Sequence, residues 1–573
     1  MSVKIIGINH DMFISSAALI VDGKVICAIP EERLTREKMS RSFPHNAINE
    51  CLKIGGIKID QIDYFANAYN PSVHFKKFNP IFSNNRRSRG DYFYSIPDNL
   101  IKKFSDTSFG KDTSDYTLQE ISYEGKNIKV YFVTHHLCHA ASGFLLSPFE
   151  SSAILTADGQ GEDDTVNFLL GKNNKIQILK KLKIPHSLGS FYATFTEYLG
   201  YKPDSDEWKV MALGSYFNKQ NSYYLNKINK MINFYKDGDF ELDQKYFKQH
   251  NYTTPNYYTK KFIEEIGPPR KKNEKFTKRH YEIAYSMQKI FEKIGFHMLN
   301  FLQKKTKSKN LVLSGGAFMN SVFNGKITKN TNFKKVWLGP CPDDSGLSIG
   351  AGLYLHNNIL NKKSRYVMKH NYLGPEFSDP DILKVLKKFK LKINKSKNIY
   401  KETAQLISQK KIVGWFQGKM EFGQRALGHR SILADARFIE SKKLLNAAVK
   451  YRESYRPFAP SILKEYSKNY FYTDSEIPFM EKVVLAKKRA FEEIPAVVHN
   501  DGSARVQTVC KDNNLIFYKL LKEYYKITKV PCVINTSFNV NGEPIVCTPE
   551  DAIKTFFSCG LDCLVIGNYI LYK

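Results

Sequence analysis

Two separate stretches of the chain repeat one pattern of apolar and polar positions. In the first, residues 3–30, the apolar runs are "VKIIGI", "SSAALIV" and "VICAIP", with the turn "DGK" between the last two. In the second, residues 152–182, the runs are "SAILTADG", "TVNFLLG" and "IQILKKL", with the turn "KNNK" between the last two. Short apolar runs bounded by turn residues predict strands, and a tight turn joins two strands into a hairpin.

This repeat predicts a duplicated fold. Each stretch reads as strand, polar loop, strand, tight turn, strand, and ATPases of the actin/hexokinase type consist of two such halves. In those proteins the loops between the first two strands of each half face a shared nucleotide cleft. Two hairpins also occur in other α/β proteins, so the pattern by itself indicates only the α/β class.

The rest of the chain contains a helical stretch and a second alternating block. Residues 216–305 are polar and are predicted to be mostly helical, with "EIAYSMQKIFEKIGFHMLNFLQK" as the clearest helical period. Residues 360–375 show no sustained period and carry several charges, so we place a domain boundary there. Strands and helices alternate after it. We therefore predict two domains, residues 1–362 and 363–573, both of α/β class.

Composition agrees with a folded protein of more than one domain. A chain of 573 residues is too long for a single core, and 42% apolar residues exclude extensive disorder. No apolar run reaches the length of a bilayer span, and "MSVKIIGINHD" lacks the features of a signal peptide, so we expect a soluble cytoplasmic protein. The nine cysteines contain no CxxC pair, which argues against a disulfide framework and a cysteine zinc site.

The formal net charge of +30 allows two interpretations. It could indicate a nucleic-acid partner, or a lysine-rich surface on an enzyme with anionic small substrates. Much of the excess lies in "QKKTKSKN" and "PPRKKNEKFTKRH", away from the glycine-rich segments. This distribution favours the solvated surface, with nucleic acid as the less favoured partner.

The segment "VTHHLCHAASG" is the first candidate for chemistry. His135 and His139 are four residues apart, which places both rings on one face of a helix, where they could bind one cation. Asp158 ends an apolar strand in "LTADGQGE", and Asp344 follows another strand in "CPDDSG". Two imidazoles with one or two carboxylates suit Fe(II), Mn(II) or Zn(II). Alternatively, both aspartates cap turns.

Two further patterns are candidates for binding anions. "SGGAFMNS", residues 314–321, and "GLSIGAG", residues 346–352, offer glycines to a nucleotide, although tight packing explains them equally well. In the C-terminal block, cations are interleaved with apolar positions instead of forming a lysine run, which favours phosphate or carboxylate binding over structural ion pairing. These cations are Arg425, Arg430, Lys450, Arg452, Arg456 and Arg505.

Taken together, these motifs resemble one protein family over nearly the whole chain. The chain is similar to O-carbamoyltransferases of the kind that includes the nodulation-factor, cephamycin and tobramycin carbamoyltransferases. The resemblance rests on ten segments in order: "NHDMFISSAALIVDGKV", "EERLTREK", "HHLCHAAS", "DGQGE", "HSLGSFYATFTEYLG", "SGGAFMNS", "GHRSILADAR", "RPFAP", "DGSARVQTV" and "NTSFN".

The resemblance implies a two-step reaction on two domains. A YrdC-like domain (363–573) would form carbamoyl adenylate from carbamoyl phosphate and ATP with Mg. A Kae1-like domain (1–362) would transfer the carbamoyl group to a hydroxyl of a sugar-containing or antibiotic-like small molecule. A divalent metal, expected to be Fe(II) with Mn or Zn as alternatives, would polarise the carbamoyl group. A homodimer is the assembly to test first, because the sequence sets no oligomeric state.

The resemblance also implies roles for individual residues. His135, His139, Asp158 and Asp344 would hold the metal. The catalytic residues would be His10, which lies beside the carbamoyl group, with Lys450 and Arg452. The nucleotide and adenylate would be bound by Glu207, Lys209, Gly315, Gly316, Asn320, Arg425, Arg430, Arg456 and Arg505. Trp208 departs from the family, where a glycine is usual, and this changes the expected shape of the pocket.

Two alternatives to this activity remain from the sequence. A tRNA-modifying protein of the threonylcarbamoyl-transfer kind would explain the positive charge, although no RNA-binding aromatic motif or zinc knuckle is present. A sugar kinase of the same ATPase fold would release ADP instead of AMP. The acceptor cannot be read from the sequence, and residues 70–130 and 216–280 are the loops expected to select it.

Overall fold

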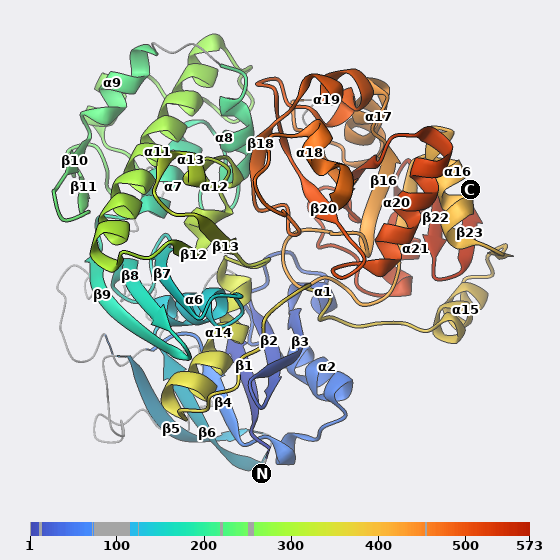
Figure 1. The fold of residues 1–573 in the computed structure, drawn as a ribbon, viewed down its shortest axis with the longest axis horizontal. Helices are drawn as coiled ribbons and strands as arrows, with labels where there is room; N and C mark the ends of the chain where they lie inside the picture. Colours follow the sequence, from blue (N-terminus) through green and yellow to red (C-terminus); the bar gives the residue numbers. More distant parts are fainter. Residues whose placement is uncertain are drawn as a thin grey trace. The chain divides into compact units, whose positions relative to one another are not determined.

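The computed structural model describes residues 2–10, 14–70, 73, 115–123, 125–217, 222–249, 257–452 and 455–573 (Figure 1). The chain forms two compact units. The first comprises Met1–Glu31 and Arg41–Met368, and the second comprises Glu32–Ser40 and Lys369–Lys573. Most of the predicted acceptor loop 70–130 lies outside the described residues, as do 218–221 and 250–256 of the predicted loop 216–280.

The division between the units differs from the predicted boundary in one unexpected way. The chain passes to the second unit after Met368, close to the expected 362, but residues 32–40 also belong to that unit. Within the second unit, Arg33 donates a hydrogen bond to the carbonyl of Gly423 (2.9 Å), and Arg36 donates to the carbonyl of Ile545 (2.6 Å). These partners are hundreds of positions away, so no local pattern could predict them.

The two large sheets of the first unit, of six and five strands, share one strand order over five strands. The first sheet runs β3-β2-β1-β4-β6-β5 and the second runs β9-β8-β7-β12-β13. In both, the first three strands form an antiparallel meander, and its first strand pairs in parallel with the next strand of the core. The strands are β1 (Lys4–Asn9), β2 (Ser16–Val21), β3 (Lys24–Pro30), β4 (Tyr64–Asn67), β5 (Tyr116–Tyr123), β6 (Lys126–Val133), β7 (Ser151–Ala157), β8 (Asp164–Lys172), β9 (Lys175–Lys183), β12 (Asn310–Ser314) and β13 (Lys335–Leu338).

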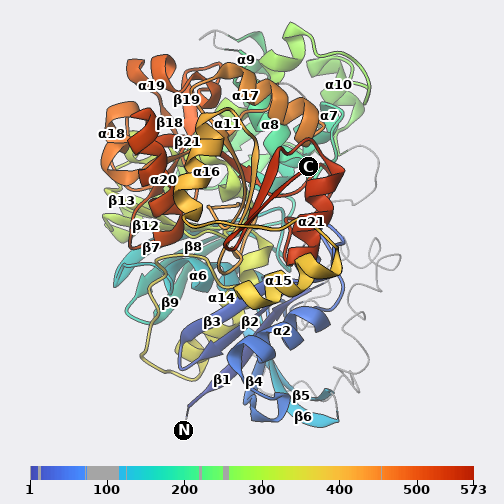
Figure 2. The same ribbon diagram turned by 90° about the vertical axis from the view of Figure 1, so that its right-hand side faces the viewer.

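This shared topology confirms the duplicated, actin/hexokinase-type arrangement predicted from the two apolar meanders. Helices α6 (His135–Phe144) and α14 (Leu347–Tyr354) pack against each other, α6 against β7 and β12, and α14 against β1 and β2. Figures 1 and 2 both show these helices between the two sheets. Every residue of α14 is buried, so "GLSIGAG" serves close packing, the alternative that the sequence left open.

Helices α7 (Leu188–Tyr198) and α11 (Lys278–Thr306) contact the second sheet, whereas α2 (His45–Gly55) packs against β2 and β3 of the first. The predicted helix around residues 282–304 is α11. The polar stretch before it also contains the hairpin of β10 (Ile232–Phe234) and β11 (Phe240–Leu242), whose three-residue strands are too short to give a sequence pattern. The other helices of this unit are α8 (Glu207–Gly214), α9 (Tyr223–Asn229), α10 (Lys260–Ile266), α12 (Ser321–Asn324) and α13 (Ile327–Asn330).

The second unit is built on one mixed sheet of eight strands, in the order β14-β23-β22-β15-β16-β21-β17-β20. Its strands are β14 (Asn394–Lys395), β15 (Val413–Phe416), β16 (Arg430–Asp435), β17 (Ala459–Leu463), β20 (Gln507–Val509), β21 (Cys532–Ser537), β22 (Cys563–Ile566) and β23 (Tyr569–Tyr572), and β18 (Val483–Leu485) pairs separately with β19 (Ser503–Arg505).

Two apolar cores lie against this mixed sheet. One contains the fully buried Trp415 together with residues of α16 (Ile399–Ser408) and α20 (Leu515–Thr528). The other contains residues of α15 (Asp379–Lys388) and α21 (Pro549–Ser558). Short helices complete the unit: α1 (Glu32–Thr35), α17 (Ile439–Leu444), α18 (Ser467–Tyr470) and α19 (Lys488–Glu493). Both units are therefore mixed α/β. Within the described part of the chain, no helix is long and apolar enough to span a membrane.

Candidate metal centre and basic cluster

The N-terminal half of α6 carries the two histidines of the candidate metal centre. His135 and His139 lie one helical turn apart, and both are fully buried. The carboxylate of Glu162 accepts the backbone N–H of His135 at 3.1 Å and also that of Asn70 at 2.8 Å. A carboxylate at this position satisfies a free helical N–H and interacts favourably with the helix dipole. Glu162 therefore fixes the start of the helix that carries both imidazoles.

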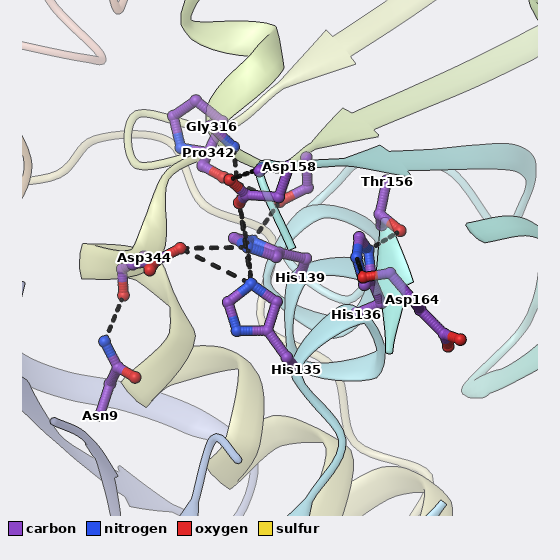
Figure 3. Close-up of polar contacts among 12 residues, drawn as sticks. Asn9, His135, His136, His139, Thr156, Asp158, Asp164, Gly316, Pro342 and Asp344 are labelled. Carbon is purple, nitrogen blue, oxygen red and sulfur yellow. Dashed lines mark hydrogen bonds and ion pairs between the residues drawn. The ribbon is translucent and has the colours of Figure 1, made fainter. Parts of the chain in front are cut away.

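Four side chains converge on one point beside α6 (Figure 3). The Nε2 atoms of the two histidines lie 3.0 Å apart. Nε2 of His139 lies 3.0 Å from Oδ2 of Asp158 and 3.5 Å from Oδ1 of Asp344. Nε2 of His135 lies 3.7 Å from each of the same two oxygens. The structure thus brings together all four residues that the sequence suggested as metal ligands.

The two aspartates reach the centre from the ends of strands. Asp158 follows β7, and its two oxygens accept the backbone N–H groups of Gly159 (2.7 Å) and Gly316 (2.9 Å). The preceding Gly315 has φ +106°, and a Cβ there would lie 2.1 Å from the carbonyl oxygen of Ala157. "SGG" is therefore a close-packed turn that holds Asp158, and the Gly316 N–H is already engaged by that carboxylate.

Opposite charges stabilise this arrangement. Burial alone would lower the pKa of His139, but hydrogen bonds and the charges of Asp158 and Asp344 raise it to about 9. Burial would raise the pKa of Asp158, but both histidines hold it well below its usual range. In the metal-free protein, protonated His139 balances the carboxylates, and a cation would replace that proton.

The donor set fits a divalent metal. Ligand atoms about 2.1 Å from an ion lie about 3.0–3.5 Å from one another. Three of the five separations given above fall within this range, and the other two are 3.7 Å. Nδ1 of His135 and Oδ2 of Asp344 are buried and have no hydrogen-bond partner among the described residues. Unpartnered buried polar atoms around a set of metal-ligating groups indicate a site that is complete only with a ligand.

His136 has a different role from its two neighbours. Its Nε2 donates to the carbonyl of Asp164 (3.0 Å), and its Nδ1 accepts the hydroxyl of Thr156 (2.8 Å), as Figure 3 shows. Burial, followed by the charges of the other two histidines, holds its pKa well below the usual value. The neutral ring thus ties α6 to β7 and β8.

The remaining predicted residues of the first unit make defined contacts. His10 is buried at the end of β1, where its ring packs edge-on against Phe43 at 5.2 Å. Asn320 exchanges hydrogen bonds with Gln288, and its side chain caps α12 by accepting the N–H of Phe323.

Glu207 and Lys209 lie in the first turn of α8. Glu207 accepts the N–H of Asp204 (2.7 Å), and burial, followed by the charge of Asp204, raises its pKa to about 8. Lys209 pairs with Asp206 at 3.0 Å and lies over the ring of Trp208 at 5.4 Å. The tryptophan that departs from the family thus packs against a predicted nucleotide-binding lysine.

In the second unit, Arg430, one of the predicted anion-binding arginines, donates hydrogen bonds to backbone carbonyls of the same unit. Arg430 is 0% exposed, and its guanidinium donates to the carbonyls of Gln417 (2.6 Å), Gly418 (3.1 Å) and Pro375 (3.3 Å). It also stacks on the ring of Phe416 at 3.7 Å. Burial lowers its pKa to about 10, so the group remains charged at neutral pH. These contacts hold the Arg430 guanidinium against backbone carbonyls of its own unit.

The other predicted cations form a basic cluster, which we define as Arg425, Lys450, Arg452, Arg456 and Arg505. Burial, followed by the charges of the three other arginines, lowers the pKa of Arg505 well below its usual value. Burial and then the charges of Arg452 and Arg456 likewise lower that of Lys450. Lys450 donates to the carbonyls of Ser537 (2.5 Å) and Asn539 (2.8 Å). Cations that raise one another's free energy in this way form a site that an anion would stabilise.

Sequence reasoning missed three residues that shape these sites. Glu162 caps α6, Asn9 supports the loop of Asp344, and Glu421 accepts the N–H groups of Leu427, His429 and Arg430. Glu162 and Asn9 lie within segments that support the family resemblance, "DGQGE" and "NHD". Their contacts reach distant parts of the chain, so spacing along the sequence gave no signal of them.

Comparisons with known proteins cover nearly the whole chain. Residues 4–353 match the family described as Carbamoyltransferase N-terminus, and residues 404–573 match Carbamoyltransferase C-terminus. A protein of Synechocystis sp. is 36% identical over 99% of this chain and 96% of its own length. Nodulation protein NolNO of Sinorhizobium fredii is 34% identical over 99% of this chain and 80% of its own length. HypF of T. kodakarensis is a distant structural neighbour, with a TM-score of 0.31 and 12% identity over 63% of this chain and 48% of its own.

Proposed function

Because the chain belongs to the carbamoyltransferase family, we propose that it is an O-carbamoyltransferase that acts through carbamoyl adenylate. Its second unit, as a YrdC-like domain, would form the adenylate from carbamoyl phosphate and ATP with Mg. Its first unit, as a Kae1-like domain, would transfer the carbamoyl group to a hydroxyl of a sugar-containing or antibiotic-like small molecule. The observation that carries this proposal is the buried centre of two imidazoles and two carboxylates, within a family that transfers carbamoyl groups.

The basic cluster suits the first step. Carbamoyl phosphate reacts with water to give carbamate and phosphate. A carbamate oxygen then attacks the α-phosphorus of ATP, the bond to the β-phosphate breaks, and pyrophosphate leaves. Each species carries phosphate or carboxylate charge, which arginines bind in a bidentate manner. Arg505 and Lys450, held among like charges, would be stabilised by these anions.

The first unit supplies the groups for transfer. The acceptor oxygen bonds to the carbamoyl carbon, the bond to the AMP oxygen breaks, and AMP leaves with that electron pair. His10 would act as the general base that takes the hydroxyl proton, a role that imidazole commonly has in enzymes. His135, His139, Asp158 and Asp344 would hold the divalent metal, Fe(II) being our first choice. When bound, it supplies Lewis acidity toward the developing negative charge on the carbamoyl oxygen.

One experiment tests the activity and the acceptor together. The purified protein is incubated with carbamoyl phosphate, ATP, Mg and a set of hydroxylated metabolites, and products are analysed by mass spectrometry. We expect one acceptor to gain the mass of a carbamoyl group, with AMP and pyrophosphate formed only when carbamoyl phosphate is present. ADP formation together with a phosphorylated acceptor would instead identify a sugar kinase. Carbamoyl-group incorporation into adenosines of tRNA would identify a tRNA-modifying protein.

A further inference from the structure

Asn9 forms part of the wall of the metal centre. It ends β1 and is 1% exposed. Its Nδ2 donates to the carbonyl of Ile14 at 2.7 Å and to that of Asp344 at 3.0 Å. Figure 3 shows this amide directed toward the backbone of Asp344, whose side chain reaches the two imidazoles. Asn9 thus links the end of the first strand to a metal-ligating residue.

The Oδ1 atom of Asn9 is buried and has no hydrogen-bond partner among the described residues. The amide cannot turn over to satisfy it, because Oδ1 would then face the carbonyls of Ile14 and Asp344, which are also acceptors. The neighbouring Ser16, which pairs with Asn9 across the sheet, donates to the carbonyl of Ser345 at 2.9 Å. The wall is therefore held in place on both strands and presents one unsatisfied acceptor.

An unsatisfied buried acceptor favours a ligand that brings an N–H or O–H donor. The carbamoyl group brings two N–H donors on its nitrogen, whereas the equally sized acetyl group has a methyl in the same place. A site built to bind a donor rejects the analogue that lacks it, because the buried acceptor then stays unpaired. We propose that Asn9 Oδ1 accepts a hydrogen bond from the carbamoyl NH₂ and thereby selects carbamoyl over acetyl donors. This inference rests on the proposed function.

The test compares two stable analogues of the acyl adenylates. 5′-O-(N-carbamoylsulfamoyl)adenosine and 5′-O-(N-acetylsulfamoyl)adenosine differ only in NH₂ against CH₃. Their dissociation constants are measured by calorimetry on the full chain loaded with Mn(II). We expect the wild type to prefer the carbamoyl analogue by about 10- to 100-fold, the range for one buried hydrogen bond. Asn9→Leu should reduce this preference to within about 3-fold, mainly by weakening binding of the carbamoyl analogue.

The ratio of the two constants separates recognition from a structural role. Loss of the Nδ2 contacts would disturb the centre for both analogues alike, so an equal loss of both affinities in Asn9→Leu would overturn the inference. Any preference between the analogues that arises in the second unit is the same in the wild type and in Asn9→Leu. It therefore does not contribute to the change in the ratio of the two dissociation constants. Asn9→Ser, which also lacks the amide oxygen, replaces the leucine variant if that protein does not fold.

A matched control is available one strand away. Ser15 is fully buried, and its hydroxyl has no partner among the described residues, but it does not contact the Asp344 loop in any hydrogen bond of the structure. Ser15→Ala removes a similar orphaned polar atom and should leave the ratio unchanged. Tight binding of both analogues without preference by the wild type would overturn the Asn9 inference alone. Failure of either analogue to bind the wild type would overturn the proposed function as well.

Discussion

The metal centre of the first unit combines groups of opposite charge, whereas the basic cluster of the second unit gathers groups of like charge. In the centre, imidazoles and carboxylates attract one another, and the backbone N–H groups of Gly159 and Gly316 hold Asp158 before any ion arrives. In the cluster, cations lie among cations, and the pKa of Arg505 falls well below its usual value as a result of burial and the surrounding arginines.

The two sites therefore depend on their ligands to different degrees. A proton on His139 keeps the charges of the metal-free centre balanced, so its geometry is preformed, and the ion competes with that proton. In the basic cluster, Arg505 and Lys450 are buried among like charges, so a bound phosphate or carboxylate should stabilise the second unit more than the metal stabilises the first. Four groups of substitutions test this difference.

The largest effect is expected at the centre. His139→Ala removes one of four converging ligands and leaves two carboxylates without their nearest positive charge. We expect divalent metal affinity to fall by about 10²- to 10³-fold or more, with loss of carbamoyl transfer. Metal content by mass spectrometry and titration with Mn(II) measure the first effect. Pyrophosphate formation from carbamoyl phosphate and ATP measures the second unit separately.

That second measurement is the control. Because the proposed adenylate chemistry lies in the second unit, pyrophosphate formation should remain within about 3-fold of the wild type in His139→Ala. Asp344→Asn should behave in the same way, since it keeps the size of the side chain and removes its charge. Stoichiometric metal with full transfer activity in either variant would show that these four residues are not the metal centre.

Two arginines of the second unit, Arg505 inside the basic cluster and Arg430 outside it, test which cations bind the ligand. Arg505→Gln should raise the KM for carbamoyl phosphate or ATP by about 10- to 100-fold, the range for a charged hydrogen bond, and leave the fold intact. Arg430→Lys should instead destabilise the second unit by about 3 kcal/mol or more, because the lysine cannot reach the carbonyls that Arg430 binds. Steady-state kinetics and urea unfolding separate the two effects.

These arginines are matched in residue type but differ in their contacts. An increase in KM for Arg430→Lys with unchanged stability would place Arg430 at the ligand after all. Equally, a destabilised Arg505→Gln protein with unchanged KM would assign the cluster to the fold. Salt or phosphate should raise the melting temperature of the wild type by more than that of Arg505→Gln.

A smaller effect is expected from the turn that holds Asp158. Gly315→Ala places a Cβ 2.1 Å from the carbonyl oxygen of Ala157 in a backbone conformation with φ +106°, so the turn must move. We expect about a 10-fold loss of metal affinity with a destabilisation of about 2 kcal/mol. Gly316→Ala, whose Cβ would lie 3.0 Å from Oδ1 of Asp158, should lose less. If the nucleotide alone needed these glycines, metal affinity would be unchanged in both.

Part of the fold and of the metal centre could be predicted from the sequence. The period of apolar residues predicted β1, β2, β7, β8, β12 and α11, because each buries one face or both faces through local contacts. His135 and His139 could be paired from their spacing, because a helix turn brings them together. Functional residues that lie on one helix or at the end of one strand can therefore be predicted from the sequence.

Contacts between segments far apart in the chain could not be predicted from the sequence. Arg430 looked like Arg505 in sequence, since both are arginines among apolar positions, and only the fold shows that Arg430 faces carbonyls of residues 375 and 417. The segment 32–40 was not expected in the second unit, because its partners lie near residues 423 and 545. Glu162 and Asn9 were missed for the same reason: hydrogen bonds to distant backbone leave no periodic signal.

The smallest expected effect concerns pH and the first turn of α8. Burial, followed by the charge of Asp204, raises the pKa of Glu207 from 4.5 in the unfolded chain to about 8. The folded protein therefore keeps a proton that the unfolded chain releases, so this contribution to stability is fully present below pH 4.5 and is lost as pH rises toward 8. Glu207→Gln stays neutral and can still accept the N–H of Asp204. We expect it to match the wild type near pH 4.5 and to exceed its unfolding free energy by about 1–2 kcal/mol at pH 8.

Urea unfolding at several pH values measures this difference, and Glu264→Gln on the exposed face of α10 serves as the control. That control should follow the wild type at every pH, because an exposed carboxyl in an ion pair on the surface contributes little. Parallel pH curves for the wild type and Glu207→Gln would mean that Glu207 is ionised in the fold at neutral pH.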